Sequence, residues 1–250
     1  MNIAIDIGNT RIKYGIFLPG GEIKVYFLLI PPRKELFNKL TAACPAPATW
    51  WIAQTGGFAW QELKAEILKV RPHDKFKIIT RRQIPLKVDV HSPAKVGIDR
   101  LLAAFAAVNN FGDVPMLIVD AGTAITLDIV QNGTFCGGAI LPGLVVQSEI
   151  YPKISKKLPL VSMSDLFSKT RPTYPGKNTQ DAILNGIHWG TIGAIRQFYE
   201  MAFPKKNALL VSTGGDTVYL SQGLAQVIPS RRFKCDGNLV LKGISGCFER

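Results

Sequence analysis

The chain has 250 residues, and 30 Lys and Arg against 18 Asp and Glu give it a formal net charge of +12 at pH 7. Hydrophobic residues make up 47% and charged residues 19%, which is typical of a packed globular protein and excludes a disordered one. No apolar run approaches the roughly 20 residues that a membrane helix needs. The first residues also lack the pattern of a signal peptide. We therefore expect a cytoplasmic protein with no membrane partner.

The positive charge does not by itself identify a partner. The basic residues occur as scattered pairs such as Arg81-Arg82 and Lys156-Lys157, with no basic tail and no basic stripe interleaved with aromatic residues. This pattern favours solubility and steering of small anionic ligands over binding of nucleic acid. The cysteines form no C-x-x-C pair, so they indicate buried reduced thiols and no structural zinc site. They are Cys44, Cys136, Cys235 and Cys247.

The first third of the chain predicts strands and then two helices. Asn2–Ile7 is an apolar strand that leads into a turn at Gly8-Asn9-Thr10, and apolar residues then alternate to Leu18. A turn at Pro19-Gly20-Gly21 should precede a third strand. The further elements expected are strand Ile23–Ile30 (stopped by Pro31-Pro32), helices Glu35–Ala43 and Gln61–Val70, and buried strands Trp50–Ala53 and Lys77–Thr80.

The strand pattern then starts again. Met116–Asp120 is an apolar strand followed by Ala121-Gly122-Thr123, and Ile125–Val130 and Phe135–Leu141 follow as strands. Asn132-Gly133 between them is a strong hairpin signal. The unit of strand, aspartate-tipped turn, strand, hairpin and strand therefore occurs twice. Such an internal repeat predicts two similar lobes.

The remaining segments fit an α/β fold of two lobes, residues 1–112 and 113–250. A helix over Ile98–Asn109 joins the lobes, and Asp113-Val114-Pro115 marks their boundary. In the second lobe we expect a helix over Asp181–Met201 and a strand over Ala208–Thr213. That strand leads into a glycine turn, Gly214-Gly215-Asp216.

Asp6 and Asp120 are the first candidates for chemistry. A carboxylate at the end of a buried strand is costly unless it is paired or binds a cation. Glycine in the adjoining turn allows the main chain to approach a ligand closely. Mg²⁺ prefers one or two carboxylates together with water and substrate phosphates. Either copy alone could be an ordinary Asp-Gly turn, but the repeat favours a phosphate and metal site.

Five motifs in chain order together resemble type III pantothenate kinase, a family in the superfamily of acetate and sugar kinases, Hsp70 and actin. The resemblance implies two ribonuclease-H-like lobes with the active site in the cleft between them. It also implies phosphorylation of pantothenate by ATP, the first step of coenzyme A biosynthesis. The motifs are Asp6–Thr10, Gly97–Arg100, Asp120–Asp128, Gly137–Gly143 and Asn178-Thr179.

The resemblance also implies a role for each matched residue. Asp99 would be the general base for the pantothenate hydroxyl. Asp120 would hold a monovalent cation, K⁺ or NH₄⁺, and Thr123 would contact ATP. The ATP phosphates, with Mg²⁺ near Asp6, would lie on a loop of Asp6, Ile7, Gly8, Asn9, Thr10, Arg11, Ile12 and Lys13. Pantothenate would contact Gly97, Ile98, Asp99, Arg100 and, from the partner subunit of a homodimer, Thr179. Gly214-Gly215-Asp216 is a weaker match to the adenosine-side turn of the superfamily.

Elementary chemistry fits these roles and also offers simpler ones. Asp99 beside Arg100 should stay ionised at pH 7, as a proton acceptor must, and Arg100 can bind a carboxylate bidentately. The alternative is that Asp99 merely begins a helix, where the dipole favours an acidic residue. Likewise Thr179 could be only the N-cap of the following helix.

One departure from the family concerns the substrate pocket. Many members carry a tyrosine shortly before the Gly-x-Asp-Arg motif, whereas this chain has Val88-Asp89-Val90-His91 there. Val90 or His91 then lines the pocket, or the pantothenate contacts differ. His91 as a catalytic base is a minor alternative, and His188 is expected to be packed or surface-facing.

Two other functions remain open. The acceptor could be another small hydroxyl compound, because the tyrosine is missing. The chain could also be a non-catalytic regulator of the same fold that contacts nucleic acid. Against that regulator, every charged residue of the kinase motifs is intact. The long apolar segments around Leu141–Ile150 and Asp181–Met201 support a homodimer.

Overall fold

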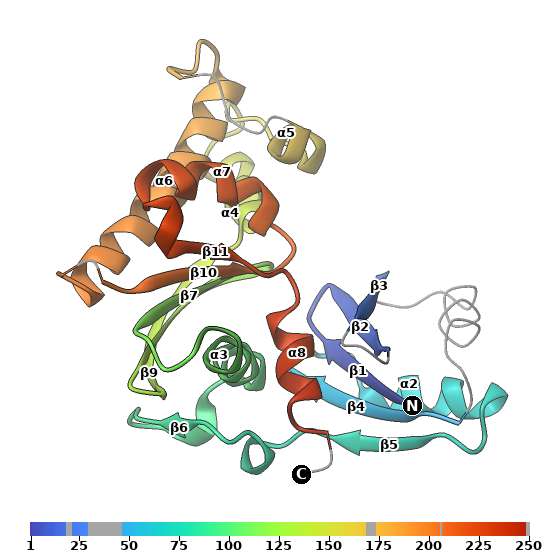
Figure 1. Cartoon of the computed structure of the whole chain (residues 1–250). Helices are drawn as coiled ribbons and strands as arrows, with labels where there is room; N and C mark the ends of the chain where they lie inside the picture. Colours follow the sequence, from blue (N-terminus) through green and yellow to red (C-terminus); the bar gives the residue numbers. More distant parts are fainter. Residues whose placement is uncertain (19–21, 30–46, 169–173, 206, 249–250) are drawn as a thin grey trace. The chain divides into compact units, whose positions relative to one another are not determined.

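The computed structural model describes residues 1–18, 22–29, 47–168, 174–205 and 207–248. The chain divides into two compact units (Figure 1). Unit 1 comprises Met1–Leu86, His91–Ala106 and Leu239–Arg250, and unit 2 comprises Lys87–Val90 and Ala107–Asn238. Four sequence features lie outside the described residues: the turn Pro19-Gly20-Gly21, the stop Pro31-Pro32, the helix Glu35–Ala43 and Cys44.

Unit 1 contains a five-stranded sheet of order β3-β2-β1-β4-β5. The first three strands form an antiparallel meander, and β1 then pairs in parallel with β4. The strands are β1 (Asn2–Ile7), β2 (Arg11–Phe17), β3 (Ile23–Leu29), β4 (Thr49–Gln54) and β5 (Lys75–Ile78).

Helices cover both faces of this sheet. Alternate residues of β1, beginning at Ile3, pack with Leu63 and Ile67 of α2 (Trp60–Val70) in one buried cluster. Helix α8 (Leu239–Ser245) packs on β1, β2 and β4. A Cβ added to Gly15 would lie 3.1 Å from Leu241 Cδ1, which places α8 on the opposite face.

A buried ion pair holds the beginning of β4. The Asp74 carboxylate accepts hydrogen bonds from Ala48 N (2.9 Å), Trp50 Nε1 (2.7 Å) and Arg71 Nε (2.5 Å). Burial raises the pKa of Asp74, but these hydrogen bonds outweigh it and leave the pKa below its ordinary value of 3.8. The pair therefore stabilises the fold in its ionised form.

Unit 2 contains a six-stranded sheet of order β11-β10-β7-β8-β9-β6. The predicted hairpin is confirmed, because Asn132 (φ 49°) and Gly133 (φ 63°) both adopt the left-handed conformation that a type I′ turn requires. The strands are β6 (Lys87–Val88), β7 (Met116–Ala121), β8 (Ala124–Gln131), β9 (Thr134–Pro142), β10 (Leu209–Thr213) and β11 (Phe233–Cys235).

The two sheets share one topology, which confirms the predicted α/β repeat. The order β3-β2-β1-β4-β5 matches β9-β8-β7-β10-β11, with the same antiparallel meander and the same parallel pairs. Asp6 lies near the end of β1 and Asp120 near the end of β7. The two aspartates therefore occupy equivalent positions in the two sheets.

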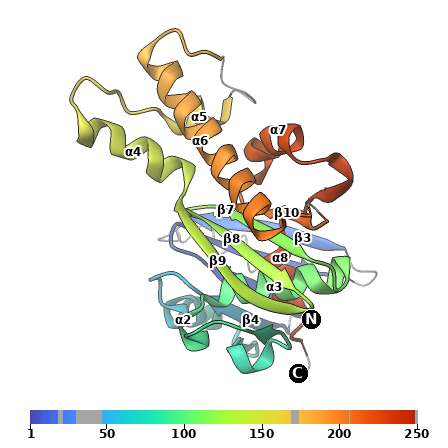
Figure 2. The ribbon, with the colours of Figure 1, turned by 90° about the vertical axis from the view of Figure 1, so that its left-hand side faces the viewer.

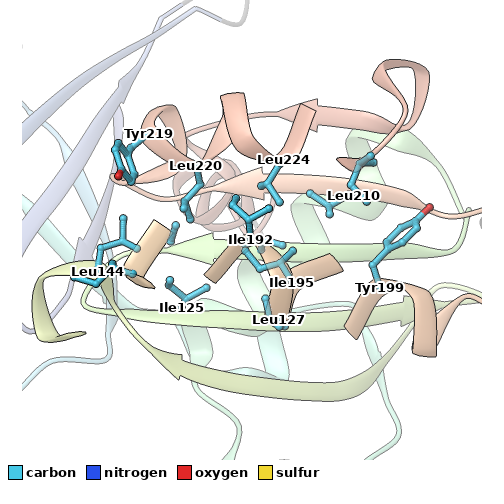
Figure 3. Close-up of a cluster of buried hydrophobic side chains, with 14 of the residues drawn as sticks. Ile125, Leu127, Leu144, Ile192, Ile195, Tyr199, Leu210, Tyr219, Leu220 and Leu224 are labelled. Carbon is cyan, nitrogen blue, oxygen red and sulfur yellow. The ribbon is translucent and has the colours of Figure 1, made fainter. Parts of the chain in front are cut away.

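Helices α6 (Thr179–Ala202) and α7 (Thr217–Val227) enclose the core of unit 2, and α4 (Leu144–Ile154) and α5 (Met163–Ser168) lie beyond the end of β9 (Figure 2). Their apolar residues pack onto β7, β8 and β10. Figure 3 shows Ile192 and Ile195 of α6 and Leu220 and Leu224 of α7 facing Ile125 and Leu127 of β8.

Helix α3 (Ile98–Phe111) extends two residues beyond the predicted Asn109. Its residues 98–106 belong to unit 1 and the rest to unit 2. Three short 3₁₀ segments complete the described elements: η1 (Arg81–Gln83), η2 (Pro93–Lys95) and η3 (Ser230–Arg232).

Some sequence predictions need correction. The strand expected over Lys77–Thr80 is β5 over Lys75–Ile78, and its residues alternate between exposed and half-buried because it is an edge strand. Of the three cysteines within the described residues, Cys136 and Cys235 are exposed and Cys247 is buried as predicted. His188 is fully buried, which agrees with the packed alternative of its prediction. No helix in the described ranges is long and apolar enough to cross a membrane.

Candidate functional site

The predicted phosphate loop is a tight hairpin between β1 and β2. Asp6 and Lys13 face each other in the strand register, and Gly8 N donates to Arg11 O at 3.1 Å to close the turn. Asn9 and Thr10 are exposed at the tip, whereas one carboxylate oxygen of Asp6 is buried. The side chains of Ile7 and Ile12 lie in the core. These two residues can therefore offer a ligand only their main chain.

A second glycine turn supports this hairpin from the end of β4. Thr55 N and Gly56 N both donate to Ile7 O, at 3.0 and 2.9 Å. A Cβ on Gly56 would lie 1.9 Å from Gly8 O, so no larger residue fits there without moving the hairpin. Gly56 was not among the site residues predicted from the sequence. Its signal was available, because Gly56-Gly57 directly follows the apolar strand at Trp50.

The Gly-x-Asp-Arg motif forms the beginning of α3. Asp99 lies in the first turn of the helix, and its Oδ1 accepts a hydrogen bond from Arg100 N at 2.9 Å. The predicted helix start and a chemical role are therefore compatible. Burial raises the pKa of Asp99 above its ordinary value of 3.8, although the hydrogen bond from Arg100 and its positive charge act in the opposite direction. A raised pKa makes the carboxylate a stronger base.

Gly97 leaves room for this carboxylate. A Cβ on Gly97 would lie 2.5 Å from Asp99 Oδ1, which is well inside van der Waals contact. The backbone of Gly97 has an ordinary φ, so the requirement for glycine here comes from the space that Asp99 occupies.

In unit 2, three turns meet at the end of β7. Gly122 N donates to Ala124 O at 3.0 Å, and Gly143 N donates to Thr123 O at 3.1 Å. Gly214 has φ +92°, and a Cβ there would lie 2.3 Å from Ala121 O and 2.4 Å from Asp120 Oδ1. Asp120, Thr123 and the Gly214 turn are thus close together. Thr123 is exposed, and Asp120 is half-buried.

Thr179 is the first residue of α6, and it is not the N-cap. Asn178 caps the helix, because its side-chain oxygen accepts a hydrogen bond from Asp181 N at 2.8 Å. The simple capping explanation for Thr179 is therefore wrong. Thr179 is exposed, and the neighbouring Asn178 already caps the helix.

Val90 and His91 are the two candidates for the position of the family's tyrosine, and their surroundings differ. Val90 lies over Gly137 of the glycine-rich motif in β9, where a Cβ would be 3.4 Å from Val90 Cγ1. Gly137 has φ +89°. His91 is exposed.

No cluster of three or more His, Cys, Asp or Glu side chains able to hold a metal occurs among the residues that the structure describes. Any cation here would need substrate oxygens or main-chain carbonyls in addition to a single carboxylate.

Comparison with known proteins connects these features. The type III pantothenate kinase family profile matches residues 2–201. A type III pantothenate kinase of Persephonella marina is 31% identical over 90% of this chain and 91% of its own length. That of Gloeobacter violaceus is also 31% identical, over 98% of this chain and 96% of its own.

Solved structures support the fold. A protein from Campylobacter jejuni, assigned to the Baf family of transcriptional activators, has a TM-score of 0.62 and 23% identity, covering 99% of this chain and 97% of its own. The activator of 2-hydroxyisocaproyl-CoA dehydratase from Clostridium difficile, with bound ADPNP, has a TM-score of 0.57 and 13% identity. It covers 98% of this chain and 92% of its own. From the matched profile and the aligned relatives, the chain belongs to the type III pantothenate kinase family.

Proposed function

We propose that this chain transfers the terminal phosphoryl group of ATP to the primary hydroxyl of pantothenate, with Asp99 as the general base. Membership in the family supports the reaction. The observation that carries the role of Asp99 is a half-buried carboxylate whose Oδ1 accepts a hydrogen bond from Arg100 N at the beginning of α3 and whose pKa is raised. Phosphoryl transfer needs positioning and charge neutralisation more than strong bases, so one oriented carboxylate is sufficient.

The Asp6–Lys13 hairpin is proposed to hold the ATP phosphates. Its glycine turn and the Gly56 turn allow main-chain N–H groups to approach phosphate oxygens, which a Cβ would obstruct. Asp6 would hold Mg²⁺ through water or together with the phosphates, and a single carboxylate fits that mode of binding. When bound, Mg²⁺ supplies positive charge that offsets the charge of the phosphate oxygens.

Asp120 is proposed to hold the monovalent cation. Asp120 Oδ1 and the carbonyl oxygen of Ala121 both lie beside Gly214, where an added Cβ would be 2.4 and 2.3 Å from them, and such oxygens are ligands that suit K⁺. Exposed Thr123 would contact ATP from the same turn.

Gly97, Ile98 and Arg100 are proposed to bind pantothenate with Asp99. Arg100 can bind the pantothenate carboxylate through two parallel hydrogen bonds. Val90 is proposed to take the place of the family's tyrosine, because it already contacts the Gly137 segment, whereas His91 is exposed.

We also propose a homodimer in which Thr179 of one subunit reaches the pantothenate of the other. Helix α4 supports this, because it exposes an apolar stripe at i, i+4 and i+8: Val146 is 42%, Ile150 48% and Ile154 66% exposed. Light scattering should show that Ile150→Asp is a monomer. The matched variant Val218→Asp changes an exposed residue of α7, and its molar mass in solution should equal that of the wild-type dimer. A dimeric Ile150→Asp protein would contradict this interface.

The proposed reaction is tested by ADP release coupled to a spectroscopic readout. Wild type should release ADP only with pantothenate, Mg²⁺ and K⁺ or NH₄⁺ present. Asp99→Asn should lose about 10²-fold or more in kcat and still bind ATP. Asp113→Asn, an exposed aspartate without a proposed role, is the matched control and should keep full activity. A wild-type rate in Asp99→Asn would reject the base, and ADP release with another alcohol alone would reject the acceptor.

A further inference from the structure

Unit 1 contains a pocket that neither Asp99 nor Arg100 lines, and Ile98 is the one lining residue that is also proposed to contact pantothenate. The pocket volume is about 570 Å³, which is within the usual range for small-molecule sites. Two arginines and six apolar residues line it: Arg81, Arg82, Ile84, Leu86, Ala94, Val96, Ile98 and Leu101. All of these belong to unit 1, so the pocket does not depend on the placement of unit 2.

The pocket lies behind the Gly-x-Asp-Arg motif. Ile98 and Leu101 of α3 line it, whereas the intervening Asp99 and Arg100 do not. In a helix, positions 98 and 101 are close to one face, while 99 and 100 point elsewhere. The pocket and the proposed catalytic carboxylate are therefore on different sides of the first turn of α3.

The two halves of the pocket differ in chemistry. Arg81 and Arg82 are consecutive residues of η1, and both are exposed. No carboxylate in the described part of the chain pairs with either arginine, and none lines the pocket. Among the apolar lining residues, Ile84 and Leu101 are buried, whereas Ala94 is exposed.

We infer that this pocket binds a small amphipathic anion, with a carboxylate or phosphate group between Arg81 and Arg82 and a short hydrocarbon body against Ile84, Val96 and Leu101. Paired guanidinium groups favour such an anion because each can donate two parallel hydrogen bonds. Burial of the hydrocarbon supplies the remaining affinity. A free inorganic ion would leave the apolar wall unused and should bind more weakly.

The inference is tested with octanoate and octyl phosphate as probes, titrated below their micelle concentrations. Binding is followed by calorimetry and by the methyl resonances of Ile84 and Ile98. Saturable binding of either probe that shifts both methyl resonances supports the site, and the tighter probe identifies the head group. Binding of 1-octanol or inorganic phosphate as tight as that of the probes would overturn it.

Three variants separate the pocket from surface charge. Arg81→Ala/Arg82→Ala and Ala94→Phe, which fills the pocket from an exposed position, should each raise the dissociation constant about tenfold or more. Lys156→Ala/Lys157→Ala removes an equal charge from an exposed pair in unit 2 and should leave binding unchanged. If the lysine variant bound the probe as weakly as the arginine variant, or if Ala94→Phe bound it as tightly as wild type, the pocket would not be the binding site.

A final titration separates this site from the substrate site. Octanoate should bind equally well with and without saturating pantothenate. Displacement by pantothenate would show that the pocket is the substrate site and overturn the inference. These readouts are binding measurements, so they remain valid whether or not the chain proves to be a pantothenate kinase.

Discussion

Replacement of Gly97 by alanine tests the catalytic geometry most directly. The new Cβ would lie 2.5 Å from Asp99 Oδ1, and ordinary contact begins at 3.4 Å, so the oxygen must move by about 0.9 Å. A displacement of about 1 Å in a reacting group costs roughly 10²-fold in rate. We expect Gly97→Ala to lower kcat/KM for pantothenate by about that factor in the coupled ADP assay. Its melting temperature should stay near that of wild type, because the φ angle of Gly97 suits alanine.

A double-mutant cycle shows whether the loss passes through Asp99. In the Asp99→Asn background there is no base left to displace, so Gly97→Ala should cost little more. Gly193→Ala is the matched control, since a Cβ there meets nothing within 4 Å in helix α6. Activity of Gly97→Ala within about threefold of wild type, or a full additive loss in the double mutant, would refute the proposed role of Asp99.

The remaining predictions concern stability, pH and the phosphate loop. Asp74→Asn should lower the free energy of unfolding by about 3 kcal/mol at pH 7, because buried Arg71 would lose the carboxylate that balances its charge. The folded-state pKa of Asp74 is depressed, so its stabilisation is present above the ordinary value of 3.8 and lost as the pH falls below it. The free energies of unfolding of wild type and variant, measured with urea, should therefore approach each other as the pH is lowered from 7 to 3. Asp99 has the opposite effect on stability, because its pKa is raised and its ionised form destabilises the folded state at pH 7. Asp99→Asn should therefore have a higher melting temperature than wild type at pH 7, although its kcat is lost. Gly56→Ala, whose Cβ would collide with Gly8 O, should raise KM for ATP, whereas Gly57→Ala, with nothing within 4 Å, should not; equal KM values would contradict the loop assignment.

The sequence predicted most strands of both sheets because their signals are local, but the short edge strands β6 and β11 were not predicted. Period-two alternation marks β2, and the Asn132-Gly133 pair alone specifies the hairpin between β8 and β9. Helices with short or mixed patterns were missed. Helix α8 has seven residues and is almost entirely buried, so it lacks the polar face that distinguishes a helix in sequence. The expected division at residue 113 stays a prediction.

The chemistry of the site depended on burial that no local pattern reveals. Arg100 beside Asp99 predicted an ionised carboxylate from their proximity in sequence alone. The structure adds desolvation, which acts against Arg100 and raises the pKa. Similarly, Thr179 could serve as an N-cap by sequence, but Asn178 is the residue whose side chain meets the helix.

The repeat explains why both aspartates adjoin turns that exclude larger residues. In each sheet the first strand pairs in parallel with the strand that follows a crossover, so the carboxyl ends of β1 and β4, and of β7 and β10, meet at one edge. A glycine after each crossover strand then packs against the aspartate's turn: Gly56 against Gly8 O, and Gly214 against Ala121 O. Two turns this close bring main-chain groups together at the end of the aspartate's strand. That arrangement suits phosphate and cation ligands, and it follows from topology before any individual catalytic residue is considered.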